Sequence, residues 1–269
     1  MNLIPVFDVD DPRISAFRDV KERDLTGRQG LFVAEGEVVL RVLTAPSSRC
    51  APAAVLIAEK RLEALREILE RLPGDVPVHT APQEVLDGIA GFHLHRGILA
   101  LGRKPEPFAL DAFLNSLPER AVVVGACGIG NHDNMGGLFR NAAAFGAAGL
   151  LLDATCCDPF YRKAIRVSVG AALRTPFVES VTAAAMVEAL ETRGFEVLAL
   201  TPSAAETLSE LKPARRTAIL LGSEGPGLPA EVIARCRPLG IRMSGGFDSL
   251  NVAATSAVAL HHLTTAGAV

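Results

Sequence analysis

Residues 121–153, AVVVGACGIGNHDNMGGLFRNAAAFGAAGLLLD, contain two short apolar runs separated by a Gly-rich loop and an Ala-rich segment with helical spacing. The runs AVVVG and GLLLD predict buried strands, and residues 134–145 predict a helix between them. A strand, a crossover helix and a second strand predict a parallel βαβ unit. The Gly-rich loop should then lie at the carboxyl end of the sheet, where α/β proteins bind their ligands.

The same alternation continues to the end of the chain. It predicts strands at TPFVE (175–179), FEVLAL (195–200), TAILLG (217–222) and PLGIRM (238–243). The helices predicted between and after these strands lie near residues 163–173 and 183–193, after Pro229, and from about Leu250. The apolar character of the strands predicts a parallel sheet covered on both faces.

A second, smaller α/β domain is predicted before this region. Its expected strands are LFVAEG (31–36), AVLIA (54–58), VPVH (76–79) and GILAL (97–101), and its expected helices span residues 38–43 and 60–72. The segment GRKPEP (102–107), with two prolines and three charges, is typical of an interdomain linker. We therefore expect two domains, residues 1–107 and residues 108–269.

The charge balance restricts how the chain can bind nucleic acid. A net charge of −3 excludes a protein coated in basic charge, so any RNA contact must come from local patches. One patch contains Arg13, Arg18, Lys21, Arg23 and Arg28, and a second contains Arg162, Lys163, Arg166 and Arg174. Each can equally be a solvated helix face, and acidic residues interrupt the first, so both interpretations stay open.

Cysteine usage and the N-terminus favour a soluble cytoplasmic protein. The five cysteines are odd in number and lack CxxC spacing, which fits a reducing compartment and predicts no zinc site. The N-terminus has no basic region before an apolar run, so we expect no signal peptide. Polar residues in the C-terminal segment argue against a membrane span.

The Gly-rich loops do not match the common nucleotide-binding motifs. Gly128 and Gly130 are followed by Asp133 where a dinucleotide-binding fingerprint needs its third glycine. Residues 222–227 lack the Lys-Ser/Thr pair of a P-loop, and Glu224 would repel phosphate, so this loop suits a cationic or neutral ligand. Asn134 and the Ser249 segment also stand at expected helix starts, where capping is an alternative role.

Four segments together resemble a known family. NMGGLFRNAAAFG (134–146), RKAIRVSVGA (162–171), GSEGPGL (222–228) and SLNVAATSAVAL (249–260) are similar, in order and spacing, to the signature motifs of the SpoU (TrmH) family of RNA 2′-O-methyltransferases. FVAEGEVVL (32–40) resembles the N-terminal RNA-binding domain of many members. The resemblance implies a C-terminal SPOUT domain with a parallel sheet and a trefoil knot, preceded by a small α/β domain with a ribosomal-protein (L30e-like) fold.

The resemblance also implies a reaction and its partners. We expect a homodimer that uses S-adenosylmethionine, without a metal, to methylate a ribose 2′-hydroxyl in structured RNA, with rRNA preferred over tRNA. The implied catalytic residues are Asn134, Arg140, Glu224, Ser249 and Asn251. The implied cofactor-binding residues are Thr201, Gly222, Ser223, Gly225, Ile241, Met243 and Leu250. The expected RNA-binding residues are Arg13, Arg18, Lys21, Arg23, Arg28, Lys163 and Arg166.

Two alternatives concern the chemistry. Arg140 either takes the proton of the 2′-hydroxyl or stays cationic and stabilises the developing alkoxide, since an arginine side chain normally stays protonated. The chain could instead be a catalytically inactive RNA-binding or ribosome-assembly factor on the same fold.

Two positions depart from the family pattern. His132-Asp133-Asn134 stands where members often have Asp-Pro-x-Asn, and Ile241-Arg242-Met243 stands where they often have Ile-Pro-Met. The second departure leaves the effect of Arg242 on cofactor affinity open.

Overall fold

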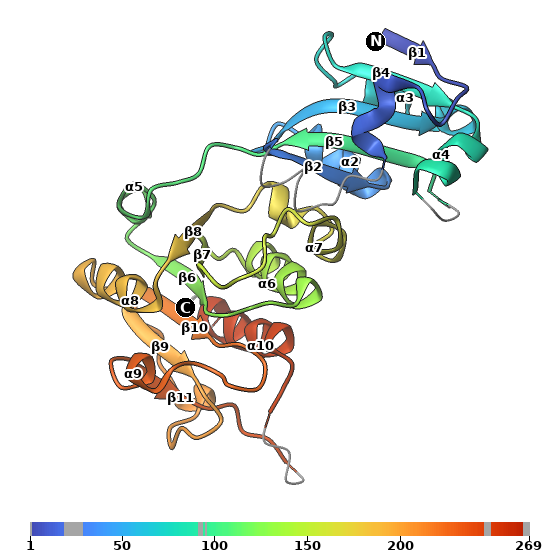
Figure 1. Ribbon diagram of the computed structural model, residues 1–269. Coiled ribbons are helices and arrows are strands. Elements are labelled where there is room, and N and C mark those ends of the chain that lie inside the picture. Colours follow the sequence, from blue (N-terminus) through green and yellow to red (C-terminus); the bar gives the residue numbers. More distant parts are fainter. Residues whose placement is uncertain (1, 19–28, 91–93, 95, 245–248, 266–269) are drawn as a thin grey trace. The chain divides into compact units, whose positions relative to one another are not determined.

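The computed structural model describes residues 2–18, 29–90, 94, 96–244 and 249–265, and it divides the chain into two compact units (Figure 1). Unit 1 contains Met1–Pro105 and Pro159–Arg174, and unit 2 contains Glu106–Asp158 and Thr175–Val269. The division after Pro105 lies within the predicted linker. We expected a single boundary between the domains. The structure differs because residues 159–174, which lie after that boundary in the sequence, belong to unit 1.

Unit 2 is built on a six-stranded sheet with strand order β11-β9-β10-β6-β7-β8. The strands are β6 (Ala121–Ala126), β7 (Gly149–Asp153), β8 (Phe177–Val181), β9 (Glu196–Leu200), β10 (Arg216–Leu221) and β11 (Arg237–Leu239). All the neighbouring strands pair in parallel. The α/β class and the parallel sheet that the apolar runs predicted are therefore confirmed.

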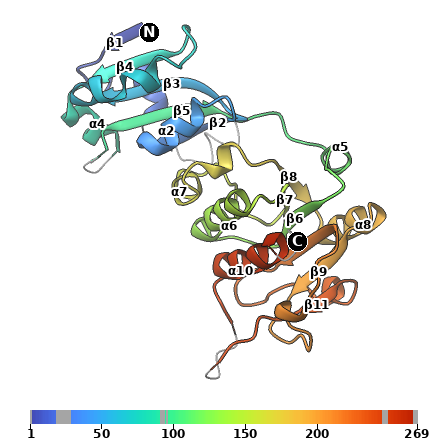
Figure 2. The ribbon, with the colours of Figure 1, turned by 180° about the vertical axis from the view of Figure 1, so that it is seen from behind.

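Helices cover both faces of this sheet. On one face lie α5 (Leu110–Asn115), α8 (Ala183–Thr192) and α9 (Ala230–Ile233), and on the other lie α6 (His132–Phe145) and α10 (Val252–Thr265) (Figures 1 and 2). Because side chains alternate along a strand, Ala218 and Leu220 of β10 join the core under α8, while Ile219 and Leu221 face the opposite side. The sheet therefore packs against buried apolar side chains on both of its faces.

Unit 1 has a mixed five-stranded sheet in the order β1-β4-β3-β5-β2. Its strands are β1 (Asn2–Pro5), β2 (Leu31–Glu35), β3 (Ala51–Ala58), β4 (Pro77–Ala81) and β5 (Ile98–Arg103). β3 pairs in parallel with β4, and β5 runs antiparallel to both β3 and β2. Its helices are α2 (Glu37–Leu43), α3 (Arg66–Leu69), α4 (Gln83–Ala90) and α7 (Arg162–Val167).

The segment 159–174 belongs to unit 1 because it packs on β2 and α2. Phe160 stacks on Phe32 with ring centroids 5.2 Å apart. Arg162 Nε donates to Glu35 Oε2 at 2.9 Å. This segment connects two strands of the unit 2 sheet, β7 and β8, so unit 1 includes a part of the chain that the sequence predicted to lie in the second domain.

Several predicted elements differ from the structure. The helix expected over residues 60–72 is wrong: the chain forms the short 3-10 turns Glu59–Arg61 and Glu63–Leu65 and then α3. Leucines and isoleucine recur there every third residue, at Leu62, Leu65 and Ile68, which matches the three residues per turn of a 3-10 helix. The strand expected at 238–243 ends at Leu239.

The remaining differences are at helix ends and in elements that we did not expect. The helix predicted over residues 163–173 ends at Val167, because Val169 and Gly170 take positive φ angles of 54° and 80°. A separate 3-10 turn, Ala171–Leu173, follows. β1, α4 and α5 were not predicted. Among the described residues, no helix is both long and apolar enough to cross a bilayer.

Candidate functional site

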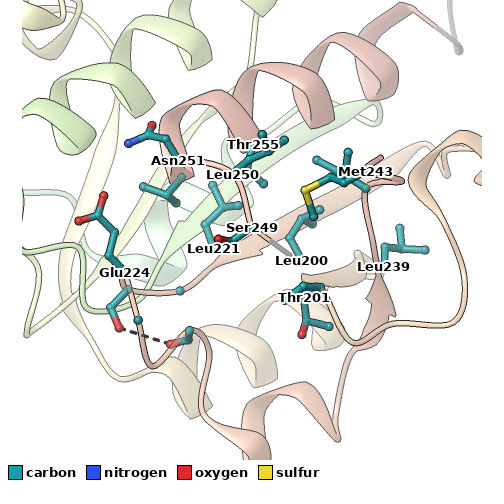
Figure 3. A pocket seen from close by; sticks show the side chains of 17 residues that line it. Leu200, Thr201, Leu221, Glu224, Leu239, Met243, Ser249, Leu250, Asn251 and Thr255 are labelled. Atoms are coloured by element: carbon teal, nitrogen blue, oxygen red, sulfur yellow. Dashed lines mark hydrogen bonds between the residues drawn. The ribbon is translucent and has the colours of Figure 1, made fainter. Parts of the chain in front are cut away.

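A pocket of about 420 Å³ lies at the carboxyl edge of the unit 2 sheet (Figure 3). β9, β10 and β11 end there, at Leu200, Leu221 and Leu239, and α10 begins beside them. Figure 3 shows Glu224 and Asn251 at one end of the pocket and Thr201, Leu239 and Met243 at the other. The full lining consists of Leu200, Thr201, Pro202, Leu221, Gly222, Ser223, Glu224, Gly225, Gly227, Leu239, Ile241, Met243, Ser249, Leu250, Asn251, Val252 and Thr255.

The loop after β10 forms one wall of the pocket because it contains glycine where the backbone doubles back. A Cβ atom on Gly222 would lie 2.2 Å from the backbone carbon of Gly227 and 2.3 Å from the nitrogen of Leu228. Gly227 N donates to Ser223 O at 3.0 Å and closes the turn. Gly225 has a φ of 86°, which glycine adopts without strain. The result is a tight backbone cradle at the pocket.

The opposite wall comes from the segments after β9 and β11. Thr201 N donates to Leu239 O at 3.0 Å, and Gly240 N donates to Glu206 O at 2.8 Å. These bonds tie the two segments together beside the pocket, where Ile241 and Met243 line it.

Arg242, which replaces the family's usual proline, is exposed and is not a lining residue. It stands near Glu210, whose pKa is lowered first by hydrogen bonds from Thr207 and, to a lesser extent, by the charge of Arg242. The residues on either side of it, Ile241 and Met243, both line the pocket.

A hydrogen-bonded group joins three distant segments at the polar end of the pocket. Asn134 is buried in the first turn of α6, and its Nδ2 donates to Glu224 Oε1. Asn251 Nδ2 donates to Asn134 Oδ1 at 2.8 Å. The side-chain carboxamide of Asn134 therefore bonds through both of its polar atoms, which aligns Glu224 and Asn251 relative to α6.

The sequence allowed a helix-capping role for Asn134 and for the Ser249 segment, and the structure gives a different answer for each. Asn131, not Asn134, caps α6, since its Oδ1 accepts from Asp133 N at 2.8 Å. The capping interpretation of Asn134 is therefore wrong. Asn251 does cap α10, since its Oδ1 accepts from Ala253 N at 2.9 Å. Because its Nδ2 donates to Asn134 at the same time, Asn251 combines the two roles.

The structure brings most of the predicted site residues together. All seven residues predicted to bind the cofactor line the pocket, as do Glu224, Ser249 and Asn251. Arg140 does not line it: it is exposed on α6 and makes no hydrogen bond or ion pair with another described residue. The predicted roles of all these residues stay predictions. The lining residues that sequence reasoning missed are mostly strand ends, such as Leu200 and Leu239, which the carboxyl-edge rule could have identified.

The residues expected to contact RNA are more scattered. Arg13 pairs with Asp11 through two guanidinium nitrogens, and Arg18 pairs with Asp10. The hydrogen bonds from Arg13 lower the pKa of Asp11 to about 2. Lys21, Arg23 and Arg28 lie outside the described residues. Lys163 and Arg166 are exposed on α7.

The charge of the pocket lining restricts its ligand. Glu224 is the one charged side chain among the described lining residues, and most of the remainder are apolar or glycine. Such a lining favours a ligand with apolar parts and positive charge. In the described part of the chain, no three His, Cys, Asp or Glu side chains are grouped as a metal site would need.

Comparisons with known proteins agree on one family. The SpoU rRNA Methylase family matches residues 121–261. An uncharacterized tRNA/rRNA methyltransferase of Mycobacterium tuberculosis is 37% identical over 273 residues, which cover 97% of this chain and 92% of that protein.

Solved structures share the fold over nearly the whole chain. An rRNA methyltransferase of Sinorhizobium meliloti, crystallised with AdoMet bound, matches with a TM-score of 0.82 and 19% identity over 97% of both chains. A protein described as an RNA 2′-O ribose methyltransferase matches with a TM-score of 0.79 and 22% identity, over 97% of this chain and 98% of that one.

Proposed function

Because this chain belongs to the SpoU rRNA Methylase family, we propose that it transfers the methyl group of S-adenosylmethionine to a ribose 2′-hydroxyl of structured RNA, with rRNA preferred over tRNA. The observation that carries the proposal is the pocket, in which Glu224 and Asn251 lie at one end of an otherwise uncharged wall. The proposal includes a cytoplasmic location, which the five free cysteines fit.

The pocket suits S-adenosylmethionine on three counts. Its volume is within the roughly 300–1,000 Å³ typical of small-molecule sites. The apolar side chains of Leu200, Leu239 and Met243 offer a surface for the adenine ring. Glu224 supplies negative charge for a cationic ligand, and the Gly222 cradle lets backbone groups approach it closely.

The cofactor supplies an electrophilic methyl group, so the protein must position the ribose and assist loss of its proton. Orientation can contribute on the order of 7–11 kcal/mol, and a general base roughly 10²- to 10⁴-fold in rate. Asn134 holds Glu224 and Asn251 in fixed positions through its two hydrogen bonds. Ser249 and Asn251, at the pocket mouth before α10, would orient the sugar.

We assign Arg140 the electrostatic role rather than that of the base. It is exposed on α6, and its cationic guanidinium stabilises the developing alkoxide and an adjacent phosphate while water or that phosphate takes the proton of the 2′-hydroxyl. Since Arg140 does not line the pocket of its own chain, we propose that it acts on the pocket of a second copy in a homodimer. The exposed apolar side chain of Val258 on α10, the helix that packs against α6, supports such an interface.

The finer features of the fold are part of the same proposal. We propose a trefoil knot in the C-terminal region, supported by the crossovers that put β10 between β6 and β9 and return α10 to α6. We also propose that unit 1 has the L30e-like fold and binds the substrate RNA.

The test is methyl transfer by the Arg140→Ala variant. Radiolabelled S-adenosylmethionine is incubated with rRNA or tRNA from a strain that lacks the gene, in the presence of EDTA. We expect transfer by the wild type, no transfer by Arg140→Ala, and equal cofactor affinity of the two by calorimetry. Arg215→Ala, an exposed arginine elsewhere in unit 2, is the control and should stay active. Wild-type activity of Arg140→Ala would contradict the assigned role.

The same experiment distinguishes a methyltransferase from the alternative, a catalytically inactive RNA-binding or ribosome-assembly factor. A catalytically inactive RNA-binding factor would show no heat with S-adenosylmethionine and no transfer to either RNA. Mapping the 2′-O-methyl groups that the deletion strain lacks then identifies the RNA and the nucleotide. A methyl group that maps to a base instead of a ribose would overturn the proposed specificity.

A further inference from the structure

The junction between β2 and α2 in unit 1 is surrounded by arginines from other parts of the chain. Three consecutive residues of the junction, Glu35, Gly36 and Glu37, are each contacted by at least one arginine. These arginines, which we call the arginine cluster, are Arg41, Arg61, Arg96 and Arg162. They come from α2, from the segment after β3, from the segment before β5, and from α7.

The arginine cluster lies at the carboxyl edge of the unit 1 sheet. β2 and β3 both run antiparallel to β5, so they share a direction, and β4 is parallel to β3. Glu35 is the last residue of β2, Arg61 follows the end of β3 by three residues, and Arg96 precedes β5 by two. In α/β sheets this edge is where ligands bind.

More guanidinium groups than carboxylates meet at the junction itself. Arg162 Nε donates to Glu35 Oε2 at 2.9 Å, and Glu37 accepts from both Arg41 and Arg61, at 2.9 and 3.0 Å. Three guanidinium groups therefore share these two carboxylates, and the fourth, that of Arg96, pairs with neither. The neighbouring Asp87 accepts hydrogen bonds from Gln83 Nε2 and Leu94 N.

Within the described part of the chain, Arg96 is the member of the arginine cluster that pairs with no other side chain. It is exposed and forms no hydrogen bond or ion pair with another described residue. Its side chain lies against the backbone of Gly36, where a Cβ atom would be 2.9 Å from Arg96 Cδ and 3.0 Å from Nη1. The absence of a side chain at residue 36 therefore lets the guanidinium lie close to the junction.

A second arginine of the cluster also has a donor that is not used within the described part of the chain. Arg61 Nε is buried and has no hydrogen-bond partner among the described residues, although Arg61 Nη2 bonds to Glu37. The Arg61 side chain lies against Gly97, the residue after Arg96, since a Cβ atom on Gly97 would be 3.4 Å from Arg61 Cγ. The Arg61 side chain as a whole is 34% exposed, so the remainder of its guanidinium is accessible to an acceptor from outside the chain.

We propose that the arginine cluster binds backbone phosphates of the substrate RNA, an inference that rests on the proposed function. Arginine binds phosphate through two parallel N–H groups, which suits this composition better than a diffuse lysine surface. The exposed Lys163 and Arg166 of α7 belong to the same unit, so the arginine cluster is one phosphate contact of unit 1 beside that predicted patch.

The test compares Arg96→Ala with a matched control, Arg71→Ala. Arg71 is an exposed arginine of the same unit that pairs with Glu67. Binding of radiolabelled total rRNA from the deletion strain is measured by filter retention between about 50 and about 200 mM KCl. We expect Arg96→Ala to weaken binding roughly fivefold and to lower the salt slope by about 0.7 to 0.9, the value for one lost phosphate contact. The control should bind as the wild type does.

Further measurements show which of the two proposals, the arginine cluster or the function, a negative result would contradict. Replacing KCl by potassium phosphate at equal ionic strength tests for a free phosphate site. If Arg96→Ala weakens the effect of phosphate but leaves RNA binding unchanged, the RNA assignment is overturned. In steady-state methyl transfer, Arg96→Ala should raise KM for RNA and leave kcat unchanged. If the wild type methylates RNA while Arg96→Ala keeps the wild-type KM and salt slope, the arginine cluster assignment is wrong and the proposed function stands. If the wild type methylates no RNA, the proposed function fails, and the binding comparison still decides the role of the arginine cluster.

Discussion

At the scale of single residues, the candidate site depends on two asparagines, Asn134 and Asn251, whose side-chain oxygen and nitrogen both form hydrogen bonds. Asn134 donates to Glu224 and accepts from Asn251, and Asn251 also caps α10. Only an amide can donate and accept in this way, because a carboxylate of the same shape would accept at both ends. This dual use explains why the sequence could not separate a capping role from a site role at Asn251.

Gly222 is the residue whose replacement tests the pocket most directly. Gly222→Ala would put a methyl group 2.2 Å from the backbone of Gly227, so the loop must open. Because that loop forms a pocket wall, we expect at least a tenfold loss of S-adenosylmethionine affinity, equivalent to about 1.4 kcal/mol. Isothermal titration calorimetry with S-adenosylmethionine measures this affinity. Gly130→Ala is the matched control, since nothing lies within 4 Å of its Cβ position, and equal affinity of the two variants would contradict the prediction.

At the scale of elements, the site requires α6 and α10 to lie very close together. A Cβ atom on Gly137 of α6 would be 2.5 Å from the Cβ of Ala253 on α10. Asn141 Nδ2 donates to Ala253 O at 2.7 Å and to Ser256 Oγ at 2.8 Å, which adds a polar contact between the helices. This packing brings Asn134 of α6 within hydrogen-bond reach of Asn251 at the start of α10.

Gly137→Ala should therefore destabilise the protein although alanine favours helix. Overpacking costs about 1 to 3 kcal/mol, and the gain in helix propensity of about 1 kcal/mol offsets only part of it. Thermal unfolding should show a lower Tm. The double variant Gly137→Ala/Ala253→Gly moves the methyl group to the other helix and should return the Tm close to the wild-type value. A double variant that unfolds as early as Gly137→Ala would show that the contact is not the cause.

At the scale of the whole molecule, the two units are not successive segments of chain. The segment 159–174 leaves the unit 2 sheet after β7, packs in unit 1, and returns to form β8. Phe160, Ala164 and Ile165 of this segment are buried there. A part of the family-matched region, residues 121–261, is therefore stabilised by the N-terminal unit.

A chain truncated to residues 106–269 tests this dependence. Removal of residues 1–105 removes Phe32 and Glu35, the partners of Phe160 and Arg162, and exposes the apolar side of segment 159–174. We expect limited proteolysis to cleave the truncated chain within this segment, while the full-length chain resists at the same protease concentration. Equal resistance of the two chains would show that the segment folds without unit 1.

The sequence alone determined the features that depend on neighbours in the chain. Apolar runs and helical spacing identified all six strands of the unit 2 sheet and the edge of the sheet at which the pocket lies, because burial and backbone geometry leave local periods in the sequence. Short-range patterns failed where spacing was ambiguous, as at residues 60–72. Only the tertiary structure decided that Asn134 bonds to Glu224 and Asn251, and that Arg162 pairs with Glu35, since these partners are far apart in the chain. Such contacts form when separate segments pack together, and no local period records which segments meet.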